Sequence, residues 1–252
     1  MTEYSSLIFD IDNTAIPDGA IEVTSNRLIQ AVSRAARNVP CIAATGRTPE
    51  FALPIIQQLE LRHLAVVANG ATLMDPSNGE LIDQRFLTAE QVDIVIKGCE
   101  QGDYKVIIAG DDREAMSVDH KKQPREALGV FVLGIYHDEA QGLADLLRTS
   151  GAGLYVYVSE GWKDDGELTY DVNISHELAT KERAVVRALG TYSLLIENAV
   201  VVGDGLNDAE LMRRAGLAVA VENAHPEIIK IAHLVVPDVF NDGLAFIIEK
   251  IF

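Results

Sequence analysis

Two aspartates, Asp10 and Asp12, end an apolar run near the beginning of the sequence, in the segment "SLIFDIDNT". Side chains on a β-strand alternate between its two faces, so residues two apart lie on the same side, about 6.6 Å apart along the strand. A hydrophobic strand that directs two negative charges to one side needs a partner for them. The alternative is that both residues only support the following turn, because Asp and Asn favour turns and helix starts.

A second acidic segment, "VVVGDGLNDAELM", supplies Asp204 and Asp208 after another apolar run. Asp204 lies between two glycines, which indicates a sharp turn of the backbone. Asp208 has an alternative structural role, because it or Asn207 could cap a helix that has Glu210 in its first turn. Asp204 is therefore the stronger candidate for a functional carboxylate in this segment.

If these two apolar runs are neighbouring strands, three or four carboxylates converge at one edge of a sheet. Two unit charges about 5 Å apart repel each other by roughly 3 kcal/mol at an effective dielectric constant of about 20. Such a cluster must hold either a proton or a cation. Oxygen ligands without a nearby cysteine or histidine favour a hard ion, Mg²⁺ rather than Zn²⁺. The two segments therefore predict a Mg²⁺ site.

Three further segments contain residues that suit the binding of an anion or another ligand. In "AATGRTP", Thr45 ends a buried run and Gly46 frees a main-chain N–H, which suits an anion and also an ordinary helix entry. Lys181 opens an amphipathic helix in "HELATKERAVVRAL", where a cation opposes the helix dipole. Another group is therefore expected to hold Lys181 there, unless it is an ordinary surface lysine. Asn69-Gly70 in "VVANGATLM" indicates a hairpin turn or a ligand contact equally.

The elements that must position these residues alternate between strands and helices. Short apolar runs with polar or glycine-containing tails are "SLIFDIDNT", "VPCIAATGRT", "HLAVVANGA", "NAVVVGDGLND" and "AGLAVAVENA", with "HLVVPD" as a weaker sixth. Continuous apolar runs predict strands that are buried on both faces, as in a parallel sheet covered by helices. Helical patterns lie between them at 25–37, from 48 onwards, at 208–215 and at 226–232. This alternation predicts an open α/β sheet, which binds ligands at the carboxyl ends of its strands.

The middle of the chain has a different pattern, in which strands occur in adjacent pairs. It predicts helices at 88–101 and 139–149, strands at 104–109, 114–118 and 130–136, and a hairpin at 154–174 with its turn at 164–166. Paired strands favour a separate α+β unit with an antiparallel sheet. We therefore expect a parallel core at 1–82 and 176–252, interrupted by an inserted α+β domain at 83–175.

The composition limits the partners and the compartment of the protein. The 252 residues carry a formal net charge of −17, which argues against a nucleic-acid or anionic membrane surface. The two cysteines, Cys41 and Cys99, lack CxxC spacing, and Cys41 lies in an apolar run and is expected to be a small buried residue. Without a disulfide framework, a reducing cytoplasm is the expected compartment. No signal peptide and no membrane-spanning apolar run are evident. The oligomeric state has no signature in the sequence.

Taken in order, the motifs DxDxT, Thr-Gly, Lys and GDxxND are far more specific than any one of them. With them the sequence resembles the haloacid dehalogenase superfamily of phosphohydrolases, and most closely its Cof-type branch, subclass IIB. "FDIDNTA", "ATGR", Lys181 and "GDGLNDAELMRRAGLAVAVENA" resemble the four motifs of that branch, and "NGA" at Asn69 is also typical. The resemblance implies a Rossmann-like core with an inserted cap. The small size of this cap resembles that of the phosphoglycolate and sucrose-phosphate phosphatases.

The resemblance also implies how the acidic residues work. Asp10 is expected to be the nucleophile that forms an aspartyl-phosphate, and Asp12 the general acid and base. Mg²⁺ is expected to bind Asp10, Asp204 and the main-chain carbonyl of Asp12. Asp208 is expected to orient the ligands of the ion or Lys181.

For the substrate, the resemblance implies a small phosphate ester whose leaving group is selected by the cap. The residues expected to bind the phosphoryl group or the rest of the substrate are Thr45, Gly46, Lys181, Asn207 and Asn69. The expected activity is Mg²⁺-dependent hydrolysis of a sugar phosphate or phosphoglycolate. A sugar-phosphate phosphotransferase or mutase of the same fold, and a phospholigand-binding regulator without turnover, are the alternatives.

Three residues depart from the pattern of the branch. Asn13 and Ala15 replace the commoner Gly and Leu in the first motif, and Glu182 follows Lys181 where Gly is usual. None of them removes a catalytic side chain. Glu182 is expected to place a negative charge near the anion site.

Overall fold

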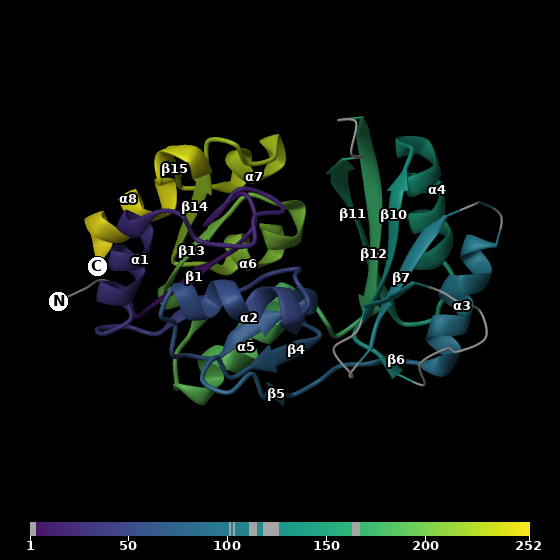
Figure 1. Cartoon of the computed structure of the whole chain (residues 1–252), viewed down its shortest axis with the longest axis horizontal. Helices are drawn as coiled ribbons and strands as arrows, with labels where there is room; N and C mark the ends of the chain where they lie inside the picture. Colours follow the sequence, from purple (N-terminus) through teal and green to yellow (C-terminus); the bar gives the residue numbers. More distant parts are fainter. Residues whose placement is uncertain (1–3, 101, 103, 111–114, 118–125, 163–166) are drawn as a thin grey trace. The chain divides into compact units, whose positions relative to one another are not determined.

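The computed structural model describes the whole chain except residues 1–3, 101, 103, 111–114, 118–125 and 163–166 (Figure 1). The chain divides into two compact units, Met1–Asp83 with Lys181–Phe252, and Gln84–Thr180. The first is built on a parallel sheet, which confirms the predicted α/β class. The sequence predicted the inserted segment at 83–175. The second unit begins one residue later than this segment, at Gln84, and ends five residues later, at Thr180. That this segment is an independent domain remains a prediction.

The core of the first unit is a five-stranded parallel sheet with the strand order β15-β14-β13-β1-β2. Its strands are β1 (Ser6–Phe9), β2 (Cys41–Ala43), β13 (Ala199–Gly203), β14 (Leu217–Val221) and β15 (Leu234–Val236). Every residue of β1, β2 and β13 is buried. Helices cover both faces of these strands, which explains why their sequences are apolar throughout rather than alternating.

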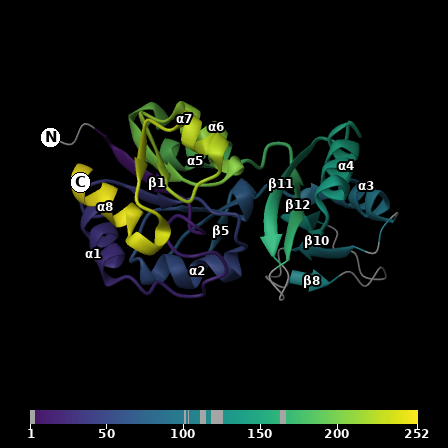
Figure 2. The same cartoon turned by 90° about the horizontal axis from the view of Figure 1, so that it is seen from above.

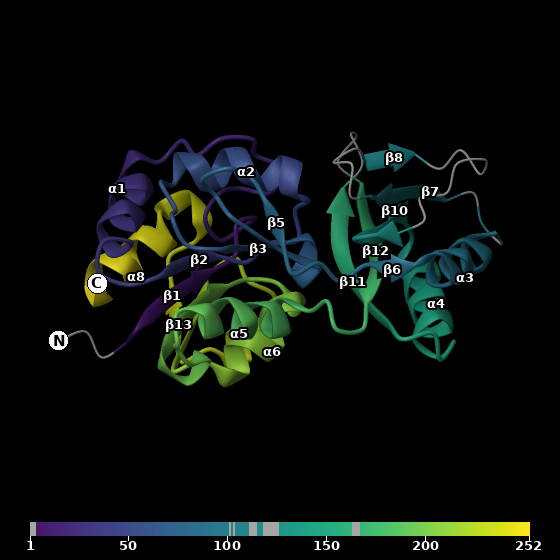
Figure 3. The same ribbon diagram turned by 90° about the horizontal axis from the view of Figure 1, so that it is seen from below.

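The helices of the first unit form two layers. On one side of the sheet lie α1 (Asn26–Ala35), α2 (Pro49–Gln58) and α8 (Gly243–Ile251), and on the other lie α5 (Lys181–Thr191), α6 (Ala209–Arg214) and α7 (Pro226–Ile231) (Figures 2 and 3). Ser25 caps α1 by accepting a hydrogen bond from the main-chain N–H of Leu28. Pro49 opens α2, a position where its missing N–H costs nothing.

The register of the sheet brings the ends of three strands together. Phe9 of β1 lies opposite Val202 of β13 on one side and Ala43 of β2 on the other. Asp10, Thr45 and Asp204 therefore follow neighbouring strands at the same carboxyl edge. The condition on which the acidic cluster was predicted, that the first and the fourth motif follow adjacent strands, is met.

A small antiparallel sheet, β3 (Ala65–Val67), β4 (Thr72–Met74) and β5 (Leu81–Ile82), adjoins β2 through a bridge between Ala44 and Val66. A 3₁₀ turn at Ala68–Gly70 connects β3 to β4, and all three of its residues have positive φ. Asparagine and glycine adopt this backbone conformation at little cost. The predicted hairpin at Asn69-Gly70 is confirmed.

The second unit is an antiparallel sheet with two helices on one of its faces (Figure 1). Its five-stranded sheet has the order β11-β12-β10-β7-β8, with β7 (Lys105–Ala109), β8 (Ala115–Ser117), β10 (Gly129–Ile135), β11 (Leu154–Trp162) and β12 (Leu168–His176). The helices are α3 (Ala89–Cys99) and α4 (His137–Arg148), and β6 (Leu87–Thr88) pairs with β9 (Glu126–Ala127). The predicted α+β composition is confirmed, whereas the turn predicted at 164–166 lies outside the described residues.

Among the helices of the described residues, none has the length and the apolar character needed to cross a lipid bilayer.

Candidate active site

Asp10 is the first residue after β1, and its side chain is buried at the edge of the sheet. Its Oδ1 accepts a hydrogen bond from the main-chain N–H of Ile11 at 2.7 Å, and its Oδ2 accepts one from Nζ of Lys181 at 2.5 Å. Burial raises the pKa of the Asp10 carboxyl well above its ordinary value, and Asp208 and Asp204 add to this, while Lys181 opposes it. An ionised Asp10 is therefore a costly group that needs positive charge nearby.

Lys181 supplies part of that charge from the first turn of α5. Its Nζ donates hydrogen bonds to Asp10 and to Oδ1 of Asp208, the latter at 2.9 Å, and the side chain has no exposed surface. Burial alone would lower the pKa of this ammonium group, but the two carboxylates raise it above the ordinary value. The two carboxylates are thus the groups that hold a lysine where the helix dipole disfavours one.

Asp208 has both carboxylate oxygens engaged. Besides the Lys181 contact, its Oδ2 accepts hydrogen bonds from the main-chain N–H groups of Asp204 (3.3 Å) and Gly205 (3.2 Å). Glycine is required at position 203, because a Cβ atom there would lie 2.6 Å from Oδ2 of Asp208. Asp208 therefore fixes both the loop after β13 and the ammonium group of Lys181.

Asp204 completes the acidic cluster from the end of β13. Its Oδ1 accepts a 2.7 Å hydrogen bond from the hydroxyl of Thr14, and its main-chain oxygen accepts one from the N–H of His225 at 2.9 Å. Burial, followed by the proximity of Asp208, raises the pKa of the Asp204 carboxyl to about 7. Asp204 is thus a second carboxylate whose charge is insufficiently compensated by the protein.

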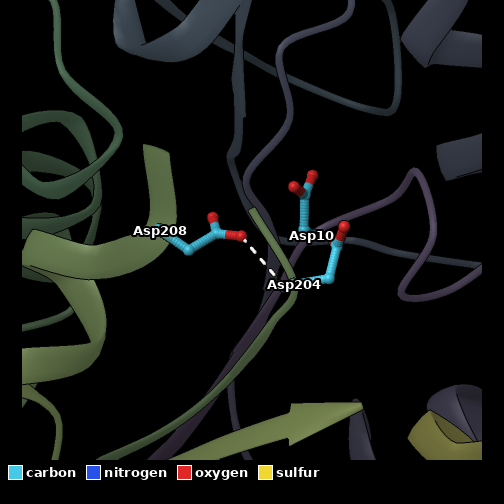
Figure 4. A group of neighbouring side chains, drawn as sticks. All are labelled: Asp10, Asp204 and Asp208. Atoms are coloured by element: carbon cyan, nitrogen blue, oxygen red, sulfur yellow. Dashed lines mark hydrogen bonds between the residues drawn. The ribbon is translucent and has the colours of Figure 1, made fainter. Parts of the chain in front are cut away.

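Asp10, Asp204 and Asp208 form a cluster of carboxylates that could hold a divalent cation. Each offers a carboxylate oxygen, and these atoms all lie within 4.8 Å of one another (Figure 4). Three carboxylates and the single ammonium group of Lys181 leave a formal charge of −2, which a divalent ion would cancel. Donors that are all oxygen atoms suit a hard ion such as Mg²⁺. Burial is the main cause of the raised pKa values of Asp10 and Asp204, and the neighbouring carboxylates add to it.

The candidate anion-binding residues lie on loops at the same edge. The hydroxyl oxygen of Thr45 accepts a 3.0 Å hydrogen bond from the N–H of Arg47, which leaves its own O–H to donate. The side chain of Asn207 donates to Oδ1 of Asn69 at 3.0 Å, and so links the fourth motif to the β3–β4 turn. A Cβ atom at Gly46 would lie 3.1 Å from Nδ2 of Asn69, so a residue without a side chain suits this close approach.

Asp12 is not one of the three clustered carboxylates and has a different partner, Arg47. The Arg47 guanidinium donates from Nε to Oδ2 (2.9 Å) and Oδ1 (3.2 Å) of Asp12, and from Nη2 to Oδ1 (2.5 Å). Sequence reasoning included Arg47 in the "ATGR" motif but gave it no role, and it did not single out Thr14. The threonine of DxDxT was the available signal for Thr14, whereas no spacing rule connects Arg47 to Asp12.

Two of the three departures from the motif pattern have a structural explanation. Asn13 has a φ of 54°, a conformation that Asn tolerates better than other residues with a side chain, and its Oδ1 accepts from the N–H of Asp18 at 3.2 Å. Glu182 forms an ion pair with Arg214 of α6, so its charge has a partner outside the anion site. Nothing in the structure explains Ala15 in place of a larger residue.

Comparisons with known proteins agree with this architecture. A model of the haloacid dehalogenase-like hydrolases matches residues 7–139 and 166–248. The chain is 25% identical over 261 residues to "Putative phosphatase YkrA" of Bacillus subtilis, covering 97% of this chain and 96% of that protein. A haloacid dehalogenase-like hydrolase from B. subtilis superimposes with a TM-score of 0.82 at 18% identity, over 98% of this chain and all of that one (100%). A subclass IIB sugar phosphatase gives a TM-score of 0.76 at 18% identity, over 98% of both chains.

Proposed function

Since the chain belongs to the haloacid dehalogenase-like hydrolases and is a phosphatase of their Cof type, we propose that it hydrolyses the phosphate monoester of a small metabolite, such as a sugar phosphate or phosphoglycolate. One observation carries this proposal. The buried ammonium group of Lys181 joins Asp10 to Asp208 beside Asp204, so a nucleophile, a cation for the phosphoryl oxygens and the ligands for a metal ion meet at one edge of the sheet. A simple phospholigand binder has no need of this combination.

The proposed metal ion is Mg²⁺, held by the carboxylates of Asp10 and Asp204 and by the main-chain carbonyl of Asp12. When bound, Mg²⁺ would reduce the repulsion between the Asp10 carboxylate and the negatively charged phosphoryl group. Asp208 keeps its two oxygens for Lys181 and the loop after β13, and so acts on the site by orienting these groups.

In the first half of the proposed reaction, a carboxylate oxygen of Asp10 attacks phosphorus. A bond forms between Asp10 and phosphorus, and the bond between phosphorus and the leaving oxygen breaks. Protonated Asp12 donates its proton to the leaving oxygen, so an alcohol departs and an aspartyl-phosphate remains. The two carboxyl groups have different partners, since Lys181 donates to Asp10 and Arg47 donates to Asp12.

In the second half, Asp12 takes a proton from a water molecule, whose oxygen attacks phosphorus. The bond between phosphorus and Asp10 breaks, inorganic phosphate leaves, and the carboxylate of Asp10 is restored. Both carboxyl groups end the cycle in the protonation states in which they began, so no further reactant is needed.

The phosphoryl oxygens are held by donors that are already oriented. An ammonium group has three N–H bonds, and the contacts of Lys181 with Asp10 and Asp208 use two of them, which leaves one for a phosphoryl oxygen. Thr45 contributes its free O–H, and Gly46 its main-chain N–H. Asn207 and Asn69 contribute amide groups to the binding of the substrate. Donors fixed before substrate binds stabilise the charge that develops in the transition state.

A panel of phosphorylated metabolites, assayed with Mg²⁺ for released inorganic phosphate, tests the proposed function. We expect turnover of at least one sugar phosphate or phosphoglycolate, with inorganic phosphate as the product even when an acceptor sugar is added. Transfer of the phosphoryl group to the added sugar would identify a phosphotransferase instead. Tight binding of phosphate esters without turnover at any metal concentration would contradict both enzymatic functions.

The pH dependence of metal binding follows from the carboxyl groups. Because the pKa of Asp204 is raised to about 7, a cation has to displace a proton at lower pH, and its apparent affinity falls by about tenfold per pH unit there. We expect Mg²⁺ to raise the melting temperature clearly at about pH 8 and only weakly at about pH 5.5, by mass action. Differential scanning fluorimetry of protein treated with a chelator measures this.

Two variants make the metal experiment specific. Asp204→Asn should remove most of the response to Mg²⁺, whereas Asp145→Asn, which changes an exposed carboxylate in α4, should keep it. A response that is equal at both pH values, or that persists in Asp204→Asn, would contradict the proposed ligands.

The proposal also places the reaction in the cytoplasm. Cys41 and Cys99 are buried free thiols, and burial raises their pKa values to about 12 and about 11, so both behave as apolar core residues suited to a reducing compartment.

A further inference from the structure

We propose that Arg47 is a positioning residue that orients the carboxyl group of Asp12 for general acid–base catalysis. This inference rests on the proposed function, because it assigns a task to Arg47 through the residue expected to protonate the leaving oxygen. It is drawn from the contacts of the guanidinium group, which join three parts of the first unit.

The contact between Arg47 and Asp12 is a two-point fork. Nε lies 2.9 Å from Oδ2 and Nη2 lies 2.5 Å from Oδ1, so two nitrogen atoms of the guanidinium contact the two oxygen atoms of the carboxylate. Among the described residues, this guanidinium is the only hydrogen-bond donor to the Asp12 carboxylate. A fork of this kind fixes the rotation of a carboxylate as well as its position, which a single-point ammonium contact does not.

Arg47 is itself held at both ends. Its main-chain N–H donates to the hydroxyl of Thr45 at 3.0 Å, and its main-chain oxygen accepts from the N–H of Ala68 at 2.7 Å. At the other end, Nη2 also donates to the main-chain oxygen of Ala20 at 2.7 Å. The side chain is only 12% exposed. The Arg47 side chain therefore links the candidate anion-binding loop after β2 to the loop after β1, and its position is fixed by hydrogen bonds to both loops.

Apart from Arg47, none of the described residues donates a hydrogen bond to the side chain of Asp12. The side chain is 27% exposed, and the next residue, Asn13, has the left-handed backbone conformation that reverses the chain. An effective general acid must come within about 2.6–3.2 Å of the atom that it protonates. A displacement of about 1 Å can lower a rate by about 100-fold. Arg47 supplies the orientation that this distance requires.

The leaving group of the substrate separates this role from a direct contact with substrate. The value of kcat/KM covers the steps up to departure of the leaving group. An alkyl phosphate needs a proton on its leaving oxygen, whereas the p-nitrophenolate ion departs without one. A residue that acts only through Asp12 should therefore affect kcat/KM for the alkyl ester and not for p-nitrophenyl phosphate. A residue that binds the phosphoryl group should affect both.

The experiment compares Arg47→Ala, Arg47→Lys, Asp12→Asn and the Arg47→Ala/Asp12→Asn double variant on an alkyl phosphate from the panel and on p-nitrophenyl phosphate. For Arg47→Ala we expect kcat/KM to fall by about 100-fold with the alkyl ester and by less than about threefold with p-nitrophenyl phosphate. Arg47→Lys should recover part of the loss, because a cation remains without the fork. The double variant should be no slower on the alkyl ester than Asp12→Asn alone.

Arg27→Ala is the matched control, because Arg27 makes the same two-point contact with Glu249 (3.2 and 2.7 Å) between α1 and α8. It should leave kcat/KM unchanged for both esters. The inference would be overturned if Arg47→Ala lowered kcat/KM equally for the two esters, because Arg47 would then act in substrate binding or in folding. It would also be overturned if the losses in kcat/KM of the two single variants multiplied in the double variant. An Arg47→Ala enzyme as active as the wild type would overturn this inference alone, whereas a wild-type enzyme inactive on every ester would overturn the proposed function.

Discussion

Replacing Asp10 by asparagine is expected to lower kcat by about 10⁴-fold or more, because an amide cannot form the bond to phosphorus on which the proposed mechanism depends. Asparagine has nearly the same shape, and its single oxygen can still accept one of the two hydrogen bonds that Asp10 accepts, the one from Lys181 or the one from the N–H of Ile11. The loss therefore concerns the chemistry of the oxygen and not the packing of the site. Steady-state phosphate release with the best substrate of the panel measures it.

The stability of the same variant separates lost chemistry from lost structure. Because the pKa of Asp10 is raised in the folded protein, the ionised carboxylate destabilises the metal-free fold. The protonated carboxyl group is the form that the fold favours. Its contribution to stability is fully present below the ordinary carboxyl pKa and is lost as the pH rises through the raised value. In a chelator at about pH 8, Asp10→Asn should therefore melt at the same temperature as the wild type or higher. A variant that melts far lower, or one that retains more than about 1% of the activity, would contradict this account.

Replacing Lys181 by methionine is expected to destabilise the fold by about 3–5 kcal/mol, because it leaves Asp10 and Asp208 buried without their cation. The pKa of Lys181 is raised, so the lysine contributes its full stabilisation at every pH below its ordinary value and loses it only at higher pH. The deficit of Lys181→Met should shrink on acidification, because the unpaired carboxylates then take up protons. Urea unfolding at about pH 5 and pH 8 measures both effects.

A surface lysine gives the matched control for this variant. Lys230 pairs with Glu227 on α7 with a side chain that is 66% exposed, so Lys230→Met should leave the unfolding midpoint nearly unchanged. We also expect Lys181→Met to lose about 10²–10³-fold in kcat, since a donor to the phosphoryl oxygens is gone. If Lys181→Met and Lys230→Met unfolded at the same urea concentration, the buried ammonium group would have no structural role.

Much of the core could be predicted from sequence because its signals are local. The buried strands β1, β2 and β13 are continuous apolar runs, and the polar residues that follow each run had to lie at one edge of a parallel sheet. The unusual place of Lys181 at a helix start correctly indicated that other groups hold it there. The structure identifies these groups as Asp10 and Asp208.

The other side-chain pairs of the site could not be predicted, because they depend on the paths of loops and on residues far apart in the sequence. No periodic pattern in the sequence indicates such pairs. Arg47 reaches Asp12 only because the loop after β1 turns back at Asn13, whose positive φ has no signature beyond its residue type. Glu182 was expected to place its charge near the anion site, but Arg214 pairs with it from α6. In both cases a side chain found its partner through tertiary structure rather than through spacing.

The central claim, that Asp10 carries the phosphoryl group, is tested most directly in the Asp12→Asn variant with p-nitrophenyl phosphate. The first step needs no proton donor with this ester, whereas release of phosphate needs Asp12 as a base, so the intermediate should accumulate. We predict a rapid burst of one equivalent of p-nitrophenol and, after an acid quench, mass-spectrometric detection of a phosphoryl group on the peptide that contains Asp10. Slow release of p-nitrophenol without a burst, or a phosphoryl group on any other residue, would contradict the proposed mechanism.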